Sequence, residues 1–534
     1  MEKLFAGLDV STQSCKLLVL DYEAGDIIFV DSVNYDQDLP QYKTTDGVIQ
    51  GLGRGASESD PRMWIDAVHL VFDGLSSSGI PVDRILCISV SGQQHGLVAL
   101  DAEGNLTRNR SKLWNDFSTE EECRILTERV GGKEAMIHEI GNSQRTGYTA
   151  AKIFHLLRHE PEVYERTSTL LIVHNYINWH LTGGKKGGIV IMEPGDTSGT
   201  ALWNAKTGDW SEKVISAIDP GLKAKLAAVK PADQSIGQIS GELVERYGFS
   251  AECRIDAGSG DNMYGALGTG NIQPGMVTVS LGTSGTACSI TQEPFIDPTG
   301  EIAAYCDSTG QYLSLLCVSN LANGYNQLLR QFGLTHDEFN ILVKKTTPGN
   351  SGKLLIPWYT GERTPDLPLA SPVYFGFGLD ELTKENLSRG VLEGHILNLY
   401  QGFRRMPVEA TEIRLTGGLS QSDAWCQTIA DIFEVETVPV KGEGAALGAA
   451  LHAAWVWLKE CGDHTSLQKI ASRFVILDES HRRKPNPRTS EIYRTQKKLF
   501  HALSSQLLTD KGEDPFKLRS SLISLIEKSK QSYP

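Results

Sequence analysis

Short apolar runs alternate with segments of helical spacing along most of the chain. Residues 4–10 (LFAGLDV), 84–90 (RILCISV) and 276–280 (MVTVS) predict buried strands. Residues 64–75 carry large apolar side chains at intervals of three and four, which predicts an amphipathic helix. Strands and helices that alternate in this way indicate an α/β protein. Residues 36–59 are polar and glycine-rich, and they predict a long surface loop or flap.

Two predicted hairpins, at residues 4–22 and 276–290, share one design of strand, polar turn and strand. Hydroxyl and backbone N–H groups at such tips can receive phosphate oxygens, and a carboxylate beside them can orient a magnesium ion through water. An ordinary polar tip is the alternative for the first hairpin taken alone. The repeated design suggests two copies of one domain that face each other across a cleft. The candidate phosphate-binding residues are Asp9, Thr12, Lys16, Gly282 and Thr283, with Asp9 as the candidate metal ligand.

Polar residues follow a second predicted strand. The segment SGQQHG comes directly after residues 84–90 and puts Gln94 and His95 at the strand's carboxyl end, where open α/β sheets bind ligands. Their donors and acceptors suit sugar hydroxyls, whereas a hydrogen-bonded core histidine is the alternative for His95. In LWND (residues 113–116), Trp114 and Asp116 are candidate rim groups at another strand end.

The stretch 257–270 (AGSGDNMYGALGTG) sets one carboxylate, Asp261, among five glycines. A strand–glycine turn–helix junction exposes a polar side chain beside a helix N-terminus, and glycine lets the backbone approach a ligand closely. Gly417 and Gly418 follow another predicted strand, where paired glycines suit an adenine or its ribose. Arg145 is the one cation near its turn, so it is a candidate substrate ligand; a solvated loop arginine is the alternative.

Composition narrows the function. The 534 residues carry a formal net charge of -14 with no long basic run, which argues against nucleic acid or anionic lipid as the main partner. The N-terminus does not resemble a secretory signal, and no apolar run reaches the roughly 18 residues of a membrane span. Nine cysteines without a CxxC pair or a zinc pattern suit a reduced, cytoplasmic protein. The assembly state is left open, with a homodimer as one candidate.

These parts together indicate phosphoryl transfer between small molecules. That reaction needs in-line placement, Mg²⁺ on the phosphates and a base for the acceptor hydroxyl. Asp261 is the expected base, and Asn262 beside it is expected to hold a neighbouring hydroxyl.

Nine segments also match one family in its own order. They are GLDVSTQSCK, SGQQHG, LWND, TGYTAAK, GSGDN, VSLGTSG, GERTP, LTGGLSQSDAW and GEGAALGAA. Over residues 4–505 the chain resembles the FGGY family of carbohydrate kinases, which have the actin-like (ribonuclease H-like) ATPase fold, and within it the xylulokinases. The resemblance implies a sugar-binding domain at 1–260, a nucleotide-binding domain at 261–505 and a tail at 506–534.

The resemblance also implies a reaction and residue roles. The γ-phosphate of ATP would pass, with Mg²⁺, to the 5-hydroxyl of D-xylulose, with Asp261 as general base. The implied sugar ligands are Gln94, His95, Asp261 and Asn262, the implied phosphate ligands are Thr12 and Thr283, and Gly417, Gly418 and Ser422 match the nucleotide end. Ser11 stands where most members have glycine, and the family's substrate arginine aligns with Gln144 rather than Arg145.

Other functions stay open on the sequence. A kinase for another ketose or a polyol, such as ribulose, is the first alternative. A non-catalytic sugar- or nucleotide-binding protein is the second, although a pure binder has no need of a base at Asp261. An actin- or chaperone-like ATPase is the third, and the sugar-suited cluster at Gln94 and His95 argues against it.

Overall fold

The computed structural model describes residues 2–442 and 444–508. Two compact units divide the chain, and each is described by itself. Unit 1 comprises Met1–Gln273, Ile290–Ser314 and Lys441–Ile476, and unit 2 comprises Pro274–Ser289, Leu315–Val440 and Leu477–Pro534. The domain boundary predicted between residues 260 and 261 stays a prediction. Most of the predicted tail, 509–534, lies outside the described residues.

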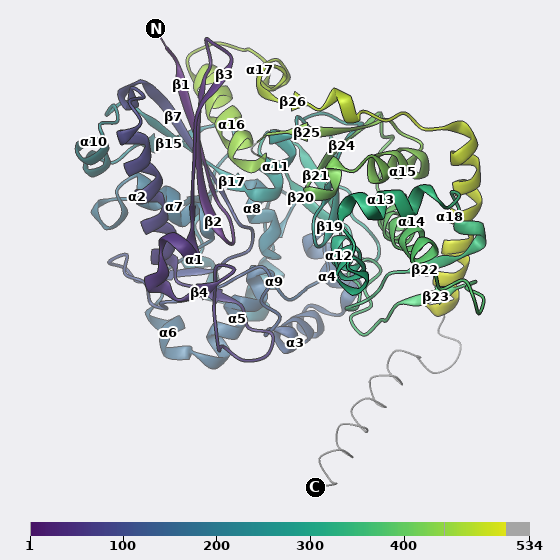
Figure 1. Cartoon of the computed structure of the whole chain (residues 1–534). Coiled ribbons are helices and arrows are strands. Elements are labelled where there is room, and N and C mark those ends of the chain that lie inside the picture. Colours follow the sequence, from purple (N-terminus) through teal and green to yellow (C-terminus); the bar gives the residue numbers. More distant parts are fainter. Residues whose placement is uncertain (1, 443, 509–534) are drawn as a thin grey trace. The chain divides into compact units, whose positions relative to one another are not determined.

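Unit 1 is built on a twisted sheet with the order β15-β16-β7-β1-β2-β3, in which β17 also pairs with β7. β1, β2 and β3 run antiparallel to their neighbours as one long ribbon (Figure 1), whereas β7 runs parallel to β1. The strands are β1 (Leu4–Val10), β2 (Ser14–Asp21), β3 (Asp26–Asn34), β7 (Ile85–Gly92), β15 (Ser235–Gln238), β16 (Arg254–Asp256) and β17 (Ser259–Gly260).

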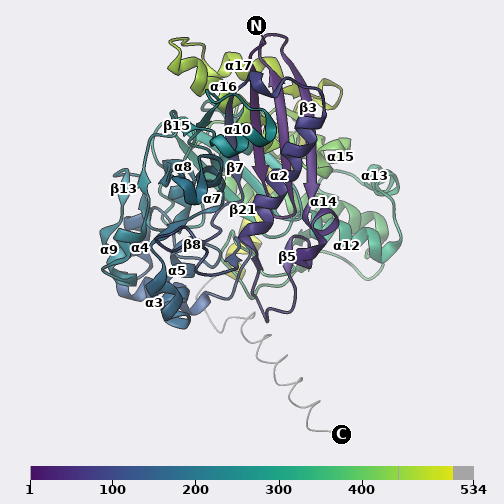
Figure 2. The ribbon, with the colours of Figure 1, turned by 90° about the vertical axis from the view of Figure 1, so that its left-hand side faces the viewer.

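Helices cover both faces of this sheet. Because side chains alternate along a strand, Leu8 of β1 packs toward α2 and Phe5 packs toward α16. Figure 2 shows α2 over the long strands. The helices of unit 1 are α1 (Tyr35–Asp38), α2 (Pro61–Ser77), α3 (Glu120–Val130), α4 (Lys133–Ile140), α5 (Thr149–His159), α6 (Pro161–Arg166), α7 (Val173–Leu181), α8 (Pro194–Thr197), α9 (Glu212–Ile218), α10 (Gly241–Tyr247), α11 (Asp261–Gly268), α16 (Gly444–Glu460) and α17 (Leu467–Phe474).

Glycines let α16 approach both the sheet and α11 at backbone distance. A Cβ on Gly7 of β1 would lie 2.1 Å from the carbonyl oxygen of Ala446 in α16. At the helix crossing, a Cβ on Gly268 would lie 1.9 Å from the carbonyl oxygen of Gly444, and one on Gly448 would lie 1.9 Å from that of Tyr264. Glycine at these three positions is therefore required by close packing of backbone against backbone.

A buried polar network ties the same helices to the sheet. His452 of α16 donates from Nδ1 to Asp256 Oδ2 over 2.8 Å and from Nε2 to the carbonyl of Ser308 over 2.8 Å. Because both ring nitrogens face acceptors, the site favours the protonated imidazole. Burial alone would lower the pKa of His452, but the Asp256 carboxylate raises it. Tyr264 of α11 links this pair to Ser89 of β7 through its hydroxyl.

A second layer of unit 1 supports the strand ends. Helices α3, α4, α5 and α9 enclose an apolar cluster that includes Leu126, Ile153 and Val214. The short strand pairs of unit 1 are β4 (Thr44–Thr45) with β5 (Val48–Ile49), β6 (Glu58–Ser59) with β9 (Ser111–Lys112), β8 (Val98–Leu100) with β10 (Thr169–Leu171), β11 (Ile191–Met192) with β14 (Ala228–Val229), and β12 (Trp203–Asn204) with β13 (Asp209–Trp210).

Unit 2 repeats the strand design of unit 1. Its central strands are neighbours in the order β21-β19-β18-β24-β25, with β18 antiparallel to β19 and parallel to β24. The strands are β18 (Met276–Leu281), β19 (Gly285–Thr291), β21 (Tyr312–Val318), β24 (Glu412–Thr416) and β25 (Thr437–Lys441), and β22 (Leu354–Ile356) pairs with β23 (Val373–Phe375). The helices are α12 (Ala322–Phe332), α13 (His336–Lys344), α14 (Lys384–Phe403), α15 (Asp423–Phe433) and α18 (Pro487–Leu507).

Most regular elements were predictable. The strand predicted at 4–10 has those bounds, the strands predicted at 84–90 and 276–280 correspond to β7 and β18, and the helix predicted over 64–75 lies within α2. The segment 36–59, predicted to be a long surface loop or flap, lies mostly at the surface, and besides irregular stretches it contains the end of α1, a short hairpin of β4 and β5, and β6. In the described part of the chain, no helix has the length and apolar character needed to cross a bilayer.

The crossing of α11 and α16 gives a test of stability. Gly448→Ala should destabilise unit 1 by roughly 1–3 kcal/mol, because the new methyl group meets the backbone of Tyr264. Gly265→Ala in α11 is the matched control. Its Cβ meets nothing within 4 Å, so the change should be neutral or stabilising by about 0.5–1 kcal/mol. Urea unfolding of both variants measures the difference, and equal midpoints would contradict the packing argument.

Candidate functional site in unit 1 and nucleotide-type loops in unit 2

Asp261 is the first residue of α11, directly after the short strand β17. Because Gly260 of β17 pairs with Gly92 at the end of β7, Asp261 is brought beside the segment that follows β7. Asn262 Nδ2 donates to Gln94 Oε1 over 2.7 Å and to Asp261 Oδ1 over 3.1 Å. Three of the five residues predicted to bind the substrate therefore form one hydrogen-bonded group.

The carboxyl of Asp261 is difficult to ionise in this setting. The residue keeps partial solvent exposure, yet protein atoms surround the carboxyl. Burial, followed by the nearby charges of Asp9 and Asp196, raises its pKa to about 8, although backbone hydrogen bonds from Asn262 and Gln94 act in the opposite direction. A carboxyl whose pKa lies near neutrality is suited to take and release a proton.

His95 is held through its own backbone. Its φ is +67°, a left-handed conformation that is uncommon for a residue with a side chain. Its carbonyl accepts hydrogen bonds from Lys152 Nζ at 2.5 Å and from Thr149 Oγ1 at 3.3 Å. The imidazole ring packs edge-on against Tyr148, with ring centroids 4.9 Å apart. Contacts with α5 and with Tyr148 just before it therefore fix the direction of the His95 side chain.

Lys152 is a residue near the candidate site that was not predicted from the sequence. It is fully buried, and burial lowers the pKa of its ammonium group to about 7. A lysine in the otherwise apolar run AAKIF was the available signal, because lysine is almost never fully buried without a specific partner. Its partner is the His95 carbonyl, so Lys152 positions a predicted sugar ligand.

A second buried carboxylate lies behind the predicted sugar ligands. Asp196 of α8 accepts from Gln94 Nε2 at 3.4 Å and from His174 Nδ1 at 2.8 Å. Gly199 beside it leaves room for the His95 ring, since a Cβ there would lie 2.5 Å from His95 Cε1. Residues 192–200 have the sequence MEPGDTSGT, which is typical of a polar loop. The helices there are too short to give a periodic signal.

The first hairpin tip places its polar groups as the sequence suggested. Asp9 at the end of β1 accepts from Ser91 Oγ at 2.8 Å and faces Lys16 across the β1–β2 ladder. Thr12 Oγ1 accepts from the indole N–H of Trp114 at 2.9 Å and donates to Gln93 Oε1 at 3.3 Å. The tip is thus a turn whose hydroxyl is already oriented by protein donors and acceptors.

The surroundings of Asp9, the candidate metal ligand, favour a cation beside its carboxyl group. Burial raises its pKa to about 6, and its charge in turn raises the pKa of Asp261. A divalent cation would relieve this repulsion, and Mg²⁺ is usually held by one or two carboxylates together with substrate phosphates. Among residues 2–442 and 444–508, no group of three or more His, Cys, Asp or Glu side chains forms a metal cage of its own.

The predicted nucleotide-type loops lie in unit 2. The turn at Gly282 and Thr283 receives hydrogen bonds on its carbonyls from Ala322 N at 3.0 Å and Leu321 N at 3.2 Å, at the start of α12. Gly417 has φ +85°, and a Cβ there would lie 2.7 Å from the carbonyl oxygen of Leu281, so glycine is required. The two loops therefore pack directly against one another.

Gly418 and Ser422 complete the second loop. A Cβ on Gly418 would meet no atom within 4 Å, which leaves open space over that position. The hydroxyl of Ser422 donates to Asn340 Oδ1 at 2.9 Å and thereby ties the loop to α13. Thus the structure gives Gly418 an open surface and gives Ser422 a protein partner.

Two predicted positions have structural partners in unit 1. Arg145 donates from Nη2 to the carbonyl of Gly300 at 2.9 Å and from Nε to Ser143 Oγ at 3.1 Å, so it ties the 142–148 turn to the 290–314 segment. Asp116 was wrong as a rim group: it is fully buried and accepts from the N–H of Ser57 at 2.9 Å.

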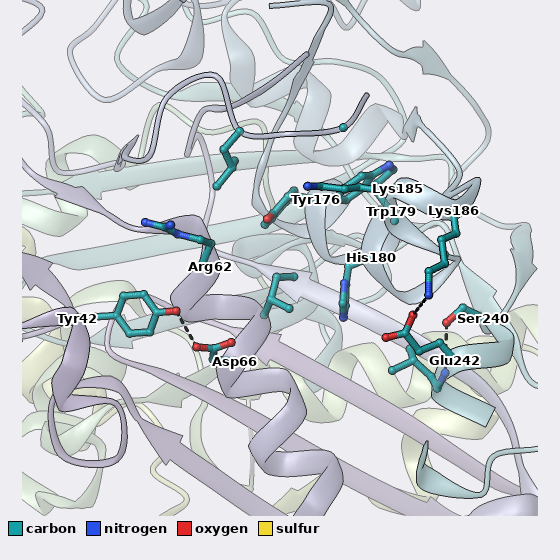
Figure 3. Close-up of a pocket in the computed structure, with 16 residues that line it drawn as sticks. Tyr42, Arg62, Asp66, Tyr176, Trp179, His180, Lys185, Lys186, Ser240 and Glu242 are labelled. Carbon is teal, nitrogen blue, oxygen red and sulfur yellow. Dashed lines mark hydrogen bonds and ion pairs between the residues drawn. The ribbon is translucent and has the colours of Figure 1, made fainter. Parts of the chain in front are cut away.

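A separate cavity of about 460 Å³ opens elsewhere in unit 1 (Figure 3). None of the predicted site residues lines it. Its polar groups largely pair with each other: Tyr42 donates to Asp66 at 2.7 Å, and Lys186 forms an ion pair with Glu242 at 2.8 Å. The predicted site is therefore supported by convergent polar groups rather than by cavity size.

Known proteins match the chain over most of its length. Residues 4–268 match the N-terminal domain of the FGGY family of carbohydrate kinases, and residues 277–457 match its C-terminal domain. A xylulose kinase of Haemophilus influenzae is 32% identical over 515 residues, covering 94% of this chain and 100% of that protein.

Solved structures share the fold. A ligand-bound xylulose kinase from Lactobacillus acidophilus superimposes with a TM-score of 0.84 at 24% identity, covering 95% of this chain and 99% of that one. A gluconate kinase from the same organism also gives 0.84 at 24% identity, covering 96% and 99%. The predicted actin-like α/β fold is thereby confirmed, and the two domain matches decide the family. The chain belongs to the FGGY family of carbohydrate kinases.

Proposed function

We propose that this carbohydrate kinase transfers the γ-phosphate of ATP to the 5-hydroxyl of D-xylulose. The observation that carries the sugar assignment is the full-length, 32% identical xylulose kinase of Haemophilus influenzae. The fold itself does not choose the sugar, because a xylulose kinase and a gluconate kinase superimpose equally well. In this proposal, unit 1 supplies the sugar ligands and the Thr12 turn, and unit 2 supplies the nucleotide loops.

Asp261 is the proposed general base. The 5-hydroxyl of the sugar attacks the γ-phosphorus, a new O–P bond forms, and the bond from the γ-phosphorus to the β,γ-bridging oxygen breaks to release ADP. Asp261 accepts the hydroxyl proton as the bond forms. Its support is the raised pKa and the hydrogen bond that orients the carboxyl through Asn262.

The remaining groups are proposed to bind and orient. Gln94 and His95 would hold sugar hydroxyls, and their support is the fixed turn clamped by Lys152. The Thr12 hydroxyl and the backbone of the Thr283 turn would donate to phosphate oxygens. Mg²⁺, bound with ATP and held by Asp9 through water, would neutralise charge on the phosphates.

A coupled assay of ADP formation across ketoses, polyols and gluconate tests the sugar. We expect D-xylulose to give the highest kcat/KM, with ribulose and gluconate lower by roughly tenfold or more, because loss of one well-placed hydroxyl contact costs about 1.4 kcal/mol or more. A higher kcat/KM for ribulose or gluconate would reassign the substrate. If none of these compounds stimulates ADP formation, the proposed function is refuted.

Asp261→Asn tests the base. The amide cannot accept the hydroxyl proton, so kcat should fall by roughly 10²–10⁴-fold. The sugar Kd by calorimetry should change little, because asparagine keeps the side chain's shape and one oxygen acceptor. A kcat close to that of the unaltered enzyme would refute the assignment, and an equal loss in sugar binding would point to a binding role alone.

The same substitution should also show a pH-dependent gain in stability. The carboxyl of Asp261 titrates near 3.8 when unfolded and at about 8 when folded. Between these values the unfolded chain has lost the proton that the folded chain retains, so stability falls as pH rises. The Tm advantage of Asp261→Asn over the unaltered protein should therefore grow from about pH 4 to about pH 8.

Asp101→Asn is the control for that measurement. Asp101 is half-buried at the surface, and hydrogen bonds from Asn105 lower the pKa of its carboxyl, so its substitution should bring no such gain. Both variants are compared by thermal unfolding without sugar or nucleotide. A Tm difference for Asp261→Asn that stays constant with pH would mean that folding does not raise the pKa of the Asp261 carboxyl.

A further inference from the structure

Residues 36–59 pack against the turn of the β1–β2 hairpin, which contains Thr12. Neither the family match nor the proposed function gives this segment a role. The Asp46–Gly47 pair forms the two-residue turn between β4 and β5, since Thr45 pairs with Val48 across it. Both turn residues have positive φ, +54° and +75°, which is the geometry of a type I′ turn. The pair is Asp-Gly, the composition that this turn favours.

This turn presses directly on the backbone of Thr12. A Cβ built on Gly47 would lie 1.9 Å from the carbonyl oxygen of Thr12 and 3.2 Å from Cα of Gln13. Both contacts are with backbone, which cannot rotate away as a flexible side chain can. Glycine at position 47 is therefore required twice, by its positive φ and by the close approach.

The Asp46–Gly47 turn is itself held by hydrogen bonds with two side chains, those of Asp36 and Ser59. The carboxylate of Asp36 accepts from Thr44 Oγ1 at 2.6 Å, from Asp46 N at 2.6 Å and from Gly47 N at 3.1 Å. The carbonyl of Gly47 accepts from the buried hydroxyl of Ser59 at 2.5 Å. Because the turn is held in place by these bonds, its close contact with Thr12 restricts where the Thr12 backbone can lie.

The far end of the same segment holds the residue that orients the Thr12 hydroxyl. The carbonyl of Gly55 accepts from Phe117 N at 2.6 Å, and that of Ser57 accepts from Leu113 N at 2.9 Å. These bonds flank Trp114, whose indole N–H donates to Thr12 Oγ1. Because an indole N–H can only donate, it occupies an acceptor site of the hydroxyl, and the hydroxyl hydrogen goes to a separate acceptor, here Gln93 Oε1 at 3.3 Å.

We propose that residues 36–59 form a positioning strap for the phosphate-binding turn. Gly47 fixes the Thr12 backbone from one side. Gly55 and Ser57 hold the Trp114 segment, whose indole N–H donates to Thr12 Oγ1, so that the hydroxyl hydrogen, which Gln93 Oε1 accepts here, would be given to a phosphate oxygen on ATP binding. The strap is a positioning element, because it acts through Thr12 and Trp114. The inference rests on the proposed function, because it assumes that Thr12 binds a phosphate of ATP.

Gly47→Ala tests the strap, with Gly51→Ala as the matched control. Both glycines lie in the same segment with nearly equal positive φ, +75° and +80°, but a Cβ on Gly51 meets nothing within 4 Å. Gly47→Ala should lower kcat/KM for ATP by roughly tenfold or more and leave the sugar Kd by calorimetry unchanged. Gly51→Ala should leave both constants close to those of the unaltered enzyme.

Asp36→Asn is the second variant, because Gly47→Ala could displace the segment altogether. Its amide NH₂ would oppose the backbone N–H groups of Asp46 or Gly47 without adding a clash at Thr12. It should also lower kcat/KM for ATP and spare the sugar Kd, with a smaller loss than Gly47→Ala. The sugar used is the one that the unaltered enzyme phosphorylates best.

The outcomes separate the two proposals. If the unaltered enzyme phosphorylates no sugar, the proposed function fails. If it is active and Gly47→Ala matches Gly51→Ala in kcat/KM for ATP, the strap alone is overturned. A loss of sugar affinity equal to the loss in kcat/KM for ATP would also overturn it, because a general disruption of unit 1 would explain both.

Discussion

The close crossing of α11 and α16 is the constraint on which the rest of unit 1 depends. Carbonyl oxygens of Gly444 and Tyr264 occupy the space that side chains on Gly268 and Gly448 would fill. Because the two helices touch at backbone distance, neither can rotate or slide without a clash. Asp261 is the first residue of α11, so its place at the end of β7 is set by packing one and two turns further along the helix.

The electrostatics of the site follow from that placement. Asp261 lies near Asp9 and Asp196, and burial raises the pKa of nearby Glu193 to about 7 although His174 opposes the shift. Carboxyl groups gathered in this way are costly when all are ionised, because their charges repel in a poorly solvated region. A site of this kind is expected where a cation and a reacting hydroxyl are bound, since both compensate the cost.

The sequence was sufficient for elements with a clear period or a recognisable turn. The strands predicted at 4–10 and 276–280 and the helix predicted over 64–75 needed no tertiary information. The clamp of Lys152 on the His95 carbonyl could not be derived, because it joins a helix to a turn 57 residues away. The Asp46–Gly47 turn was predictable, since Asp-Gly between Thr-Thr and Val-Ile is a typical hairpin pattern. The wider glycine-rich composition of 36–59 obscured it.

Close approaches of the backbone at three glycines help to position the site. Gly7 admits α16 to β1, Gly199 admits the His95 ring, and Gly47 admits the strap to Thr12. Such contacts depend on the course of the chain and little on the polar side chains that face a ligand. One scaffold can therefore keep its phosphoryl-transfer geometry while a few side chains change the sugar, which agrees with the equal superposition on a xylulose kinase and a gluconate kinase. Under the proposed function Gln94 and His95 would make that choice, because Lys152 and Thr149 hold the His95 carbonyl independently of the sugar.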